Sequence, residues 1–259
     1  MGLLDGRKAL VFGVANDHSI AWGIAKAFHD QGALVGFSSQ ESLIERRVRP
    51  LAESIGSTFV EACDMQSDDD IRRVLTAWHD RHGEVDVLVH AVAYAKREDL
   101  DGTFVDTSRD GFALALDVSA YSLVALAREA RPYLRRGSSI ITLSYYGAEK
   151  VVAHYNVMGV AKAALEASVR YLAADLGPEG VRVNAISAGP IRTLSASGIA
   201  GFRKLHGPFN EIAPLRAHIT IEDVGGSAVY LASDLSSAVT GAVVYVDGGF
   251  NILGVPLLD

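Results

Sequence analysis

The sequence predicts an α/β fold, in which a doubly wound parallel sheet of about seven strands carries helices on both faces. Two observations lead to this prediction. Short apolar segments rich in β-branched residues alternate with longer segments of helical periodicity along the 259-residue chain. In addition, the first apolar segment runs into a glycine-containing turn and then a helix, a pattern typical of nucleotide-binding sheets of this class.

The predicted strands are short apolar segments with the composition of buried parallel strands. They are residues 8–13, 33–38, 57–62, 86–91, 138–144, 181–187 and 242–249. The predicted helices are residues 20–31, 41–55, 68–82, 107–135, 155–176 and 222–233. Ser67 before three aspartates and Thr220 before Glu222 are start signals for two of them. This spacing leaves little room for a second domain, so we expect residues 1–259 to form a single Rossmann-type domain.

One long interval, from Gly189 to Arg216, contains no predicted strand or helix. An interval of this length inside a compact domain is more often a lid or a binding loop than a defect of folding. We therefore expect a substrate-binding lid near residues 190–216.

The composition is that of an ordinary folded protein, with 49% apolar and 21% charged residues. The net charge of −7 argues against nucleic acid as a partner, because neutralising phosphates requires an excess of Lys and Arg. The single cysteine, Cys63, excludes an internal disulfide, and the histidines lack metal-binding spacing, so we expect no metal site. Neither a signal peptide nor a membrane-spanning apolar run is evident, which favours the cytoplasm and no membrane partner.

The turn after the first predicted strand could bind a dinucleotide. In the segment GVANDHSIAWG, Gly13 lies at the turn, and Ser19 and Ile20 open the helix. Backbone N–H groups in such a turn can approach a pyrophosphate, which the helix N-terminus stabilises. The spacing departs from the G-x-G-x-x-G pattern, so Gly13 and Gly23 could instead serve only a turn and helix packing.

The ends of the second and third predicted strands would lie beside the adenosine of that dinucleotide. Gln40 could hydrogen-bond the ribose or the adenine, whereas Glu41 would repel a 2′-phosphate, which favours NADH over NADPH. Asp64 and Met65 could flank the adenine, with Asp64 accepting a hydrogen bond from its amino group. The alternative for Asp64 is a turn-capping role.

Tyr155 and Lys162 both fall in the predicted helix 155–176. Residues seven apart on an α-helix differ by about 20° around the axis and about 10 Å along it. The two side chains would therefore share a face without touching, and could act on different parts of one bound assembly.

Several motifs together resemble a known family. The chain is similar to the short-chain dehydrogenase/reductase superfamily and, within it, to the bacterial enoyl-acyl carrier protein reductases. The motifs that carry this resemblance are GVANDHSIAWG, LSYYGAE, YNVMGVAKAALEA, GPEGVRVNAISAGPIRTLSASGI, TIEDVG and VVYVDGGF. LSYYGAE and the Tyr155–Lys162 spacing are specific to the reductases, whereas the glycine turn and VDGG occur across the superfamily.

The resemblance implies an oxidoreductase of fatty acid elongation. It would reduce the 2,3 double bond of trans-2-enoyl thioesters by hydride transfer from NADH. The implied partner is the acyl carrier protein that bears the substrate, and the implied assembly is a homotetramer.

Two positions distinguish this chain from the carbonyl-reducing members of the superfamily. Those members resemble one another in a tyrosine one helical turn before the lysine and a serine further upstream. Met158 and Tyr145 occupy these positions here, and a methionine cannot protonate an alkoxide. Hydride addition to the β-carbon of an enoyl thioester instead places negative charge on a carbonyl oxygen further along the substrate. A tyrosine one turn further out, Tyr155, matches that displacement.

The resemblance therefore implies that Tyr145, Tyr155 and Lys162 are catalytic. Tyr155 would hydrogen-bond the thioester oxygen and stabilise the enolate. Lys162 would hold the nicotinamide ribose, the alternative being a solvated surface lysine. Tyr145 would be a second active-site residue, with core packing as its alternative role.

The remaining expected site residues surround the nicotinamide and the acyl chain. The expected cofactor contacts are Val92, Ile191, Arg192, Thr193, Leu194 and Ser195, and Ala95 joins Tyr145 and Tyr155 in the substrate site. Two other functions remain as alternatives. A ketone reductase is disfavoured by Met158, and a nucleotide-sensing regulator without turnover is disfavoured by the joint presence of the two tyrosines and Lys162.

Overall fold

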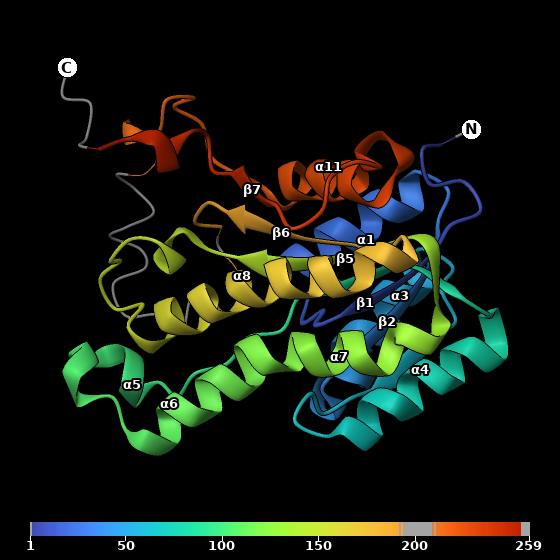
Figure 1. Ribbon diagram of the computed structural model, residues 1–259, viewed down its shortest axis with the longest axis horizontal. Helices are drawn as coiled ribbons and strands as arrows, with labels where there is room; N and C mark the ends of the chain where they lie inside the picture. Colours follow the sequence, from blue (N-terminus) through green and yellow to red (C-terminus); the bar gives the residue numbers. More distant parts are fainter. Residues whose placement is uncertain (1, 192, 194–208, 210, 255–259) are drawn as a thin grey trace.

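The computed structural model describes residues 2–191, 193, 209 and 211–254. These residues contain one seven-stranded sheet, ordered β3-β2-β1-β4-β5-β6-β7, in which every neighbouring pair is parallel. The strands are β1 (Lys8–Phe12), β2 (Leu34–Ser39), β3 (Val60–Ala62), β4 (Val85–His90), β5 (Leu134–Ser144), β6 (Arg182–Ala188) and β7 (Val243–Val246) (Figure 1). The predicted α/β class and the seven-stranded parallel sheet are confirmed.

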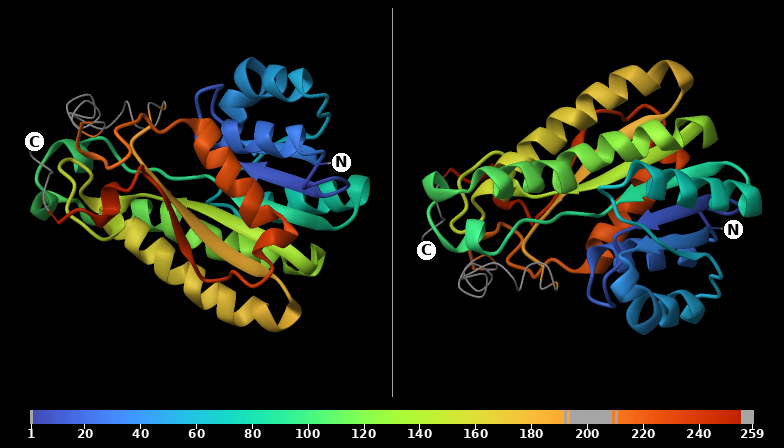
Figure 2. Two further views of the ribbon diagram at one scale, coloured as in Figure 1. Left: turned by 90° about the horizontal axis from the view of Figure 1, so that it is seen from above. Right: turned by 90° about the horizontal axis from the view of Figure 1, so that it is seen from below.

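Helices cover both faces of the sheet (Figure 2). One face carries α1 (Ile20–Asp30), α3 (Arg49–Ser54) and α11 (Ile221–Ala232), and the other carries α4 (Asp68–His82), α7 (Ser122–Ala130) and α8 (Val157–Leu176). Shorter helices are α2 (Glu41–Leu43), α5 (Glu98–Asp101) and α6 (Arg109–Leu116). Each face has its own apolar core, with Phe28 and Phe37 buried in one and Trp78 and Leu123 in the other.

Two predicted helices are interrupted. The predicted helix 41–55 is divided by a π-helical turn, Ile44–Val48, and the predicted helix 107–135 by another, Asp117–Tyr121. The second helix also ends at Ala130, because Pro132 in the following 3₁₀ turn cannot continue the α-helical hydrogen bonds. As a result β5 begins four residues earlier than predicted, at Leu134.

The segment Arg109–Tyr133 is long and apolar enough to cross a membrane, with a mean hydropathy of 1.4. Leu123 and Leu126 on this segment are fully buried in the core between the sheet and the helices. Its apolar character is therefore that of a core helix.

The start of α8 differs from the prediction in a way that affects the site. The sequence predicted a helix from residue 155, but α8 begins at Val157. Both His154 and Asn156 have positive φ, 60° and 41°, which an α-helix does not accommodate. Tyr155 therefore lies in the turn before the helix, and the inference that Tyr155 and Lys162 share one helical face was wrong.

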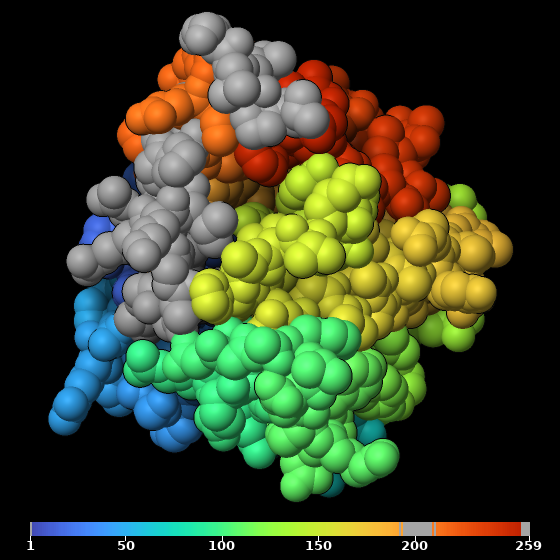
Figure 3. Space-filling view, turned by 90° about the vertical axis from the view of Figure 1, so that its left-hand side faces the viewer, coloured from blue at the N-terminus to red at the C-terminus, as the bar shows by residue number. Residues whose placement is uncertain are grey.

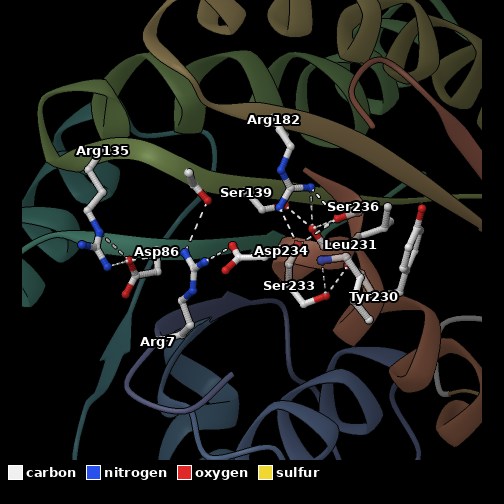
Figure 4. A network of polar contacts seen from close by, with 12 residues as sticks. Arg7, Asp86, Arg135, Ser139, Arg182, Tyr230, Leu231, Ser233, Asp234 and Ser236 are labelled. Carbon is white, nitrogen blue, oxygen red and sulfur yellow. Dashed lines mark hydrogen bonds and ion pairs between the residues drawn. The ribbon is translucent and has the colours of Figure 1, made fainter. Parts of the chain in front are cut away.

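The amino ends of four strands are joined by a polar network (Figure 4). Asp86, on β4, is buried and accepts hydrogen bonds from the backbone N–H of Lys8 on β1 (2.8 Å) and from Nε of Arg135 on β5 (2.6 Å). Arg182, at the start of β6, is also buried and donates to the carbonyl oxygens of Leu231 and Ser233 at the end of α11. A positive charge at this end of a helix is favoured by the helix dipole.

The carboxyl ends of the strands lie on the opposite side of the molecule from this network. The strand order reverses between β1 and β4, and in sheets of this topology ligands bind beyond the carboxyl ends at that point. Segments from distant parts of the chain meet on this side of the molecule, as the mixed colours of Figure 3 show.

Candidate active site

The turn after β1 is held tightly against the end of β4. Gly13 has a φ of 99°, and a Cβ there would lie 2.2 Å from the carbonyl oxygen of Ala91. The glycine is therefore required both by the backbone conformation and by this close approach. Ser19 is the N-cap of α1, and its hydroxyl donates to the carbonyl of Asn16 instead of capping the helix.

The N-terminus of α1 keeps donors available for an anion. Within the described residues, the N–H groups of Ile20 and Ala21 have no hydrogen-bond acceptor. Such groups at a helix N-terminus favour a phosphate. Gly23 has a different role, since a Cβ there would lie 2.5 Å from the carbonyl oxygen of Ile221 on α11. The helix-packing alternative thus describes Gly23.

The predicted adenosine contacts lie at the ends of β2 and β3. Gln40 is exposed immediately after β2, and Glu41 is exposed beside it at the start of α2. Met65 is buried, whereas Asp64 is exposed and accepts a hydrogen bond from the N–H of Gln66 (3.0 Å). The turn-capping alternative for Asp64 is therefore realised in the structure.

Tyr145 and Tyr155 pack against each other beyond β5. Their rings meet edge to face, with centroids 4.8 Å apart and an interplanar angle of 66°. Tyr155 is only 8% exposed. Burial raises the pKa of Tyr155 and of Tyr145, and for Tyr155 the neighbouring Tyr145 and Glu166 add to the effect. Both phenols therefore stay protonated near neutral pH and can donate hydrogen bonds.

Two glycines make room for the Tyr155 ring. A Cβ at Gly147 would lie 2.4 Å from Cδ1 of Tyr155, and a Cβ at Gly159 would lie 2.7 Å from the carbonyl oxygen of Gly147. Gly147 belongs to the LSYYGAE motif and Gly159 to the first turn of α8. Larger residues at either position would force the tyrosine or its supporting backbone to move.

A tight turn also fixes Tyr155. Asn156 has φ 41° and ψ −121°, close to the first central position of a type II′ turn, and the N–H of Met158 donates to the carbonyl of Tyr155 (2.9 Å). Glycine is the usual residue there, but the Asn156 side chain donates to the carbonyl oxygens of Leu100 (3.2 Å) and Gly102 (2.9 Å). The asparagine thus joins this turn to α5.

Lys162 is buried, at 6% exposure, and Nζ donates to the carbonyl oxygen of Leu143 on β5 (2.7 Å). The alternative of a solvated surface lysine is wrong. Burial lowers the pKa of Lys162 to about 8, against the opposing influence of the Glu166 carboxylate. The ammonium group thus loses its proton just above neutral pH.

His90, the last residue of β4, is buried beside this group. Its Nδ1 lies 2.9 Å from the hydroxyl of Thr142 and its Nε2 lies 2.8 Å from that of Ser122. Burial and the charge of Lys162 lower the pKa of His90 to about 3, so the ring is neutral and joins β4, β5 and α7.

The segment after β4 is tied to the π-helical turn of residues 117–121. Ser119 accepts from the N–H of Tyr94 (2.9 Å) and donates to its carbonyl oxygen (3.0 Å), and its hydroxyl lies 3.7 Å from the sulfur of Met158. Val92 and Ala95, which were predicted to contact the cofactor and the substrate, lie close to Tyr94 in the chain and are half-buried. Ala95 and Tyr145 both pack against the small apolar cluster that contains Tyr155 and Met158.

The last group of predicted residues follows β6. Ile191 is buried, and its carbonyl oxygen accepts from the N–H of Thr193 (2.9 Å). Arg192, Leu194 and Ser195 lie outside the described residues, as does most of the predicted lid at 190–216.

Sequence reasoning missed several residues that build the site. Gly147, Ser119, His90 and Glu166 have no signal of their own in a single sequence, because each acts through a tertiary contact. Gly147 and Glu166 do lie within the motifs LSYYGAE and YNVMGVAKAALEA, which already indicated the site.

A family model described as enoyl-(acyl carrier protein) reductase matches residues 13–251. The chain belongs to the enoyl-acyl carrier protein reductase family. This assignment confirms the family that the sequence motifs resemble.

Other members of the enoyl-acyl carrier protein reductase family share the whole fold. The NADH-dependent reductase of Aquifex aeolicus is 52% identical over 256 residues, which cover 98% of this chain and 95% of that protein. The Bacillus cereus reductase, solved with NADP+ and indole naphthyridinone, has a TM-score of 0.96 at 50% identity and covers 98% of this chain and 100% of its own. The Anaplasma phagocytophilum reductase, solved with NAD, has a TM-score of 0.95 at 48% identity, with 99% and 98% covered.

Proposed function

We propose that this protein catalyses the NADH-dependent reduction of the 2,3 double bond of trans-2-enoyl thioesters on acyl carrier protein, in fatty acid elongation. The observation that carries the proposal is the pair of the buried Tyr155 and the half-buried Tyr145, with Lys162 hydrogen-bonded to the carbonyl oxygen of Leu143. Met158 stands at the position of the carbonyl reducers' tyrosine. Family membership and the NADH-dependent relatives at about half identity support it.

The residues beyond the carboxyl ends of the strands fit a dinucleotide. The glycine turn at Gly13 brings backbone close to the end of β4, and the N-terminus of α1 offers N–H groups to a pyrophosphate. When bound, NADH supplies the hydride. The residues that would hold it are Gly13, Ser19, Ile20, Gln40, Asp64, Met65, Val92, Lys162, Ile191, Arg192, Thr193, Leu194 and Ser195.

The raised pKa of Tyr155 supports the role of hydrogen-bond donor. As charge develops on the thioester oxygen, a protonated phenol in a buried site stabilises the enolate by a hydrogen bond. Tyr145 packs against the Tyr155 ring and restricts its orientation. The Lys162 ammonium, held by Leu143, would bind the ribose hydroxyls and add positive charge near the developing anion.

The cellular setting belongs to the same proposal. The acyl chain would lie under a lid near residues 190–216, and residues 1–259 would act as one domain. Exposed rings on the helices that pack beside α8, Phe112 and Tyr121, support assembly as a homotetramer. We place the enzyme in the cytoplasm, without a membrane or nucleic acid partner.

Replacing Tyr155 with phenylalanine tests the function. We expect Tyr155→Phe to lower kcat for crotonyl-coenzyme A by about 100-fold or more while NADH affinity stays within a factor of two, because only the transition-state hydrogen bond is lost. Tyr171→Phe, at an exposed position on α8, is the matched control and should leave turnover unchanged. The measurement is steady-state oxidation of NADH.

The same assay separates the alternative functions. The wild-type protein should reduce crotonyl-coenzyme A and leave acetoacetyl-coenzyme A unchanged. Activity on the ketone would favour a carbonyl reductase, and NADH binding without any turnover would favour a regulator. Unchanged kcat in Tyr155→Phe would remove the role assigned to the phenol.

A further inference from the structure

Glu166 is a buried carboxylate that the mechanism above does not use. It lies one helical turn beyond Lys162 on α8 and is 7% exposed. The hydroxyl of Ser144 donates a hydrogen bond to its Oε1 (2.5 Å). Carboxylates are rarely buried without a specific partner, because desolvation penalises the charged form. The position of Glu166 therefore calls for a reason.

The end of β5 holds the catalytic lysine and Glu166 with consecutive residues. Leu143 accepts from Lys162, Ser144 donates to Glu166, and Tyr145, the next residue, packs against Tyr155. Three successive backbone positions thus fix three groups of the site. A change in the charge of Glu166 therefore alters the electrostatic environment of Lys162 and Tyr155.

The charged and titratable groups facing this volume come from several elements. Glu166 and Lys162 make no direct ion pair among the contacts of the described residues, so they interact through space. Arg170 on α8 and Glu149 after the 3₁₀ turn of residues 146–148 act on the charge of Glu166. The charge of Glu166 in turn acts on Tyr155 and on Tyr245 of β7, and the charge of Lys162 acts on His90 of β4. Tyr145 also acts on Tyr155.

The signs of these interactions oppose one another. Burial lowers the pKa of Lys162, and Glu166 is the neighbouring charge that raises it. The pKa of Glu166 is raised overall, first by burial and then by Glu149, although the Ser144 hydrogen bond, Arg170 and Lys162 act in the opposite direction. A short hydrogen bond from a hydroxyl favours the ionised carboxylate.

We propose that Glu166 is a positioning residue whose carboxylate, held by Ser144, maintains the positive charge of Lys162 at the pH at which the enzyme works. The inference rests on the proposed function, in which Lys162 binds the nicotinamide ribose. Glu166 itself touches neither cofactor nor substrate in this role. It acts only by keeping the lysine protonated in a site where burial favours the neutral amine.

The pH dependence of NADH affinity tests this role. In the wild-type protein, affinity should fall on the alkaline side with a midpoint near the Lys162 pKa of about 8. In Glu166→Gln, which keeps the side-chain shape, the midpoint should move about 1 pH unit lower, because the neighbouring negative charge is gone. The measurement is the fluorescence of bound NADH in titrations from pH 6 to pH 10.

Two further variants complete the test. Glu53→Gln removes a charge at an exposed position and should keep the wild-type midpoint. Ser144→Ala leaves Glu166 in place but removes its hydrogen bond, so its midpoint should shift in the same direction by less. If circular dichroism shows that Glu166→Gln does not fold, the midpoint of Ser144→Ala alone tests the proposal.

Distinct outcomes would overturn the inference and the proposed function. Midpoints for Glu166→Gln and Ser144→Ala equal to that of the wild type would overturn the inference, as would an affinity reduced by the same factor at every pH, which indicates a structural role alone. A wild-type protein that binds NADH but does not reduce crotonyl-coenzyme A would instead overturn the proposed function, while the NADH titrations would still test the lysine–glutamate pair.

Discussion

The phenol of Tyr155, the proposed hydrogen-bond donor, owes its position to the residues packed around it. Tyr155 is enclosed by Tyr145, Gly147 and Gly159, and the type II′ turn at Asn156 sets the direction from which it enters the site. Sub-ångström placement of a donor matters, because a displacement of about 1 Å can cost about 100-fold in rate. We therefore expect the glycines in the two motifs to affect the proposed activity through the placement of the Tyr155 ring.

Replacing Gly147 with alanine should show this dependence. The added Cβ would lie 2.4 Å from the Tyr155 ring, so we expect the ring to move and kcat for crotonyl-coenzyme A to fall at least about 10-fold. NADH affinity should change little. Gly226→Ala, on the exposed side of α11 with open space around it, is the control, and it should keep activity while adding about 0.5–1 kcal/mol of stability. Equal activity in the two variants would contradict the crowding argument.

At the level of elements, His90 joins β4, β5 and α7 immediately behind the site. Its two ring nitrogens contact Thr142 and Ser122, and full burial keeps the imidazole neutral. The folded protein can accept a proton at this position only at low pH, whereas the unfolded chain accepts one near pH 6.5. The contribution of His90 to the stability of the folded protein should therefore fall as the pH is lowered.

The sign of that effect follows from proton linkage. Above about pH 6.5, His90 is neutral in both states and contributes no pH dependence. Below it, the unfolded state binds the extra proton, so stability falls by about 1.4 kcal/mol per pH unit until the pH approaches the folded-state pKa of about 3.

Urea denaturation at pH 7.5 and pH 5 should reveal this contribution. We expect the loss of unfolding free energy between these values to be about 2 kcal/mol smaller in His90→Gln than in the wild type. The glutamine can still donate and accept hydrogen bonds, and it does not titrate. Identical losses in the two proteins would show that His90 is not the acid-sensitive group.

In the molecule as a whole, the carboxyl ends and the amino ends of the strands differ in function. The candidate site lies beyond the carboxyl ends, and the network of Asp86, Arg135 and Arg182 joins the amino ends (Figure 4). Because the strands are parallel, a single strand can connect a contact of this network at one end to the candidate site at the other. Asp86 and His90, for example, stand at opposite ends of β4.

This separation predicts that the amino-end network affects stability without affecting catalysis. Asp86→Asn removes the charge that Arg135 and the Lys8 N–H contact, and should cost about 2 kcal/mol of unfolding free energy. kcat and KM at 25 °C should stay unchanged. Thermal melting and the crotonyl-coenzyme A assay check both statements, with the exposed Asp80→Asn as control. A lower kcat in Asp86→Asn would contradict the separation.

The amino-acid sequence alone was enough to predict the layered α/β fold, the motif glycines, and Tyr155 and Lys162 as candidate site residues. These features follow from local patterns, since burial imposes apolar runs on parallel strands and chemistry requires particular side chains. It placed the start of α8 two residues early, because apolar periodicity does not register the positive φ of His154 and Asn156.

The surroundings of Tyr155 and Lys162 follow only from the folded structure. It buried Lys162 against Leu143, set Glu166 and His90 beside it, and gave Gly23 a packing role against α11. These contacts join residues far apart in the sequence, and a local pattern contains no information about them. The charge of a buried group depends on desolvation and on neighbours in space, which exist only once the strands and helices have packed.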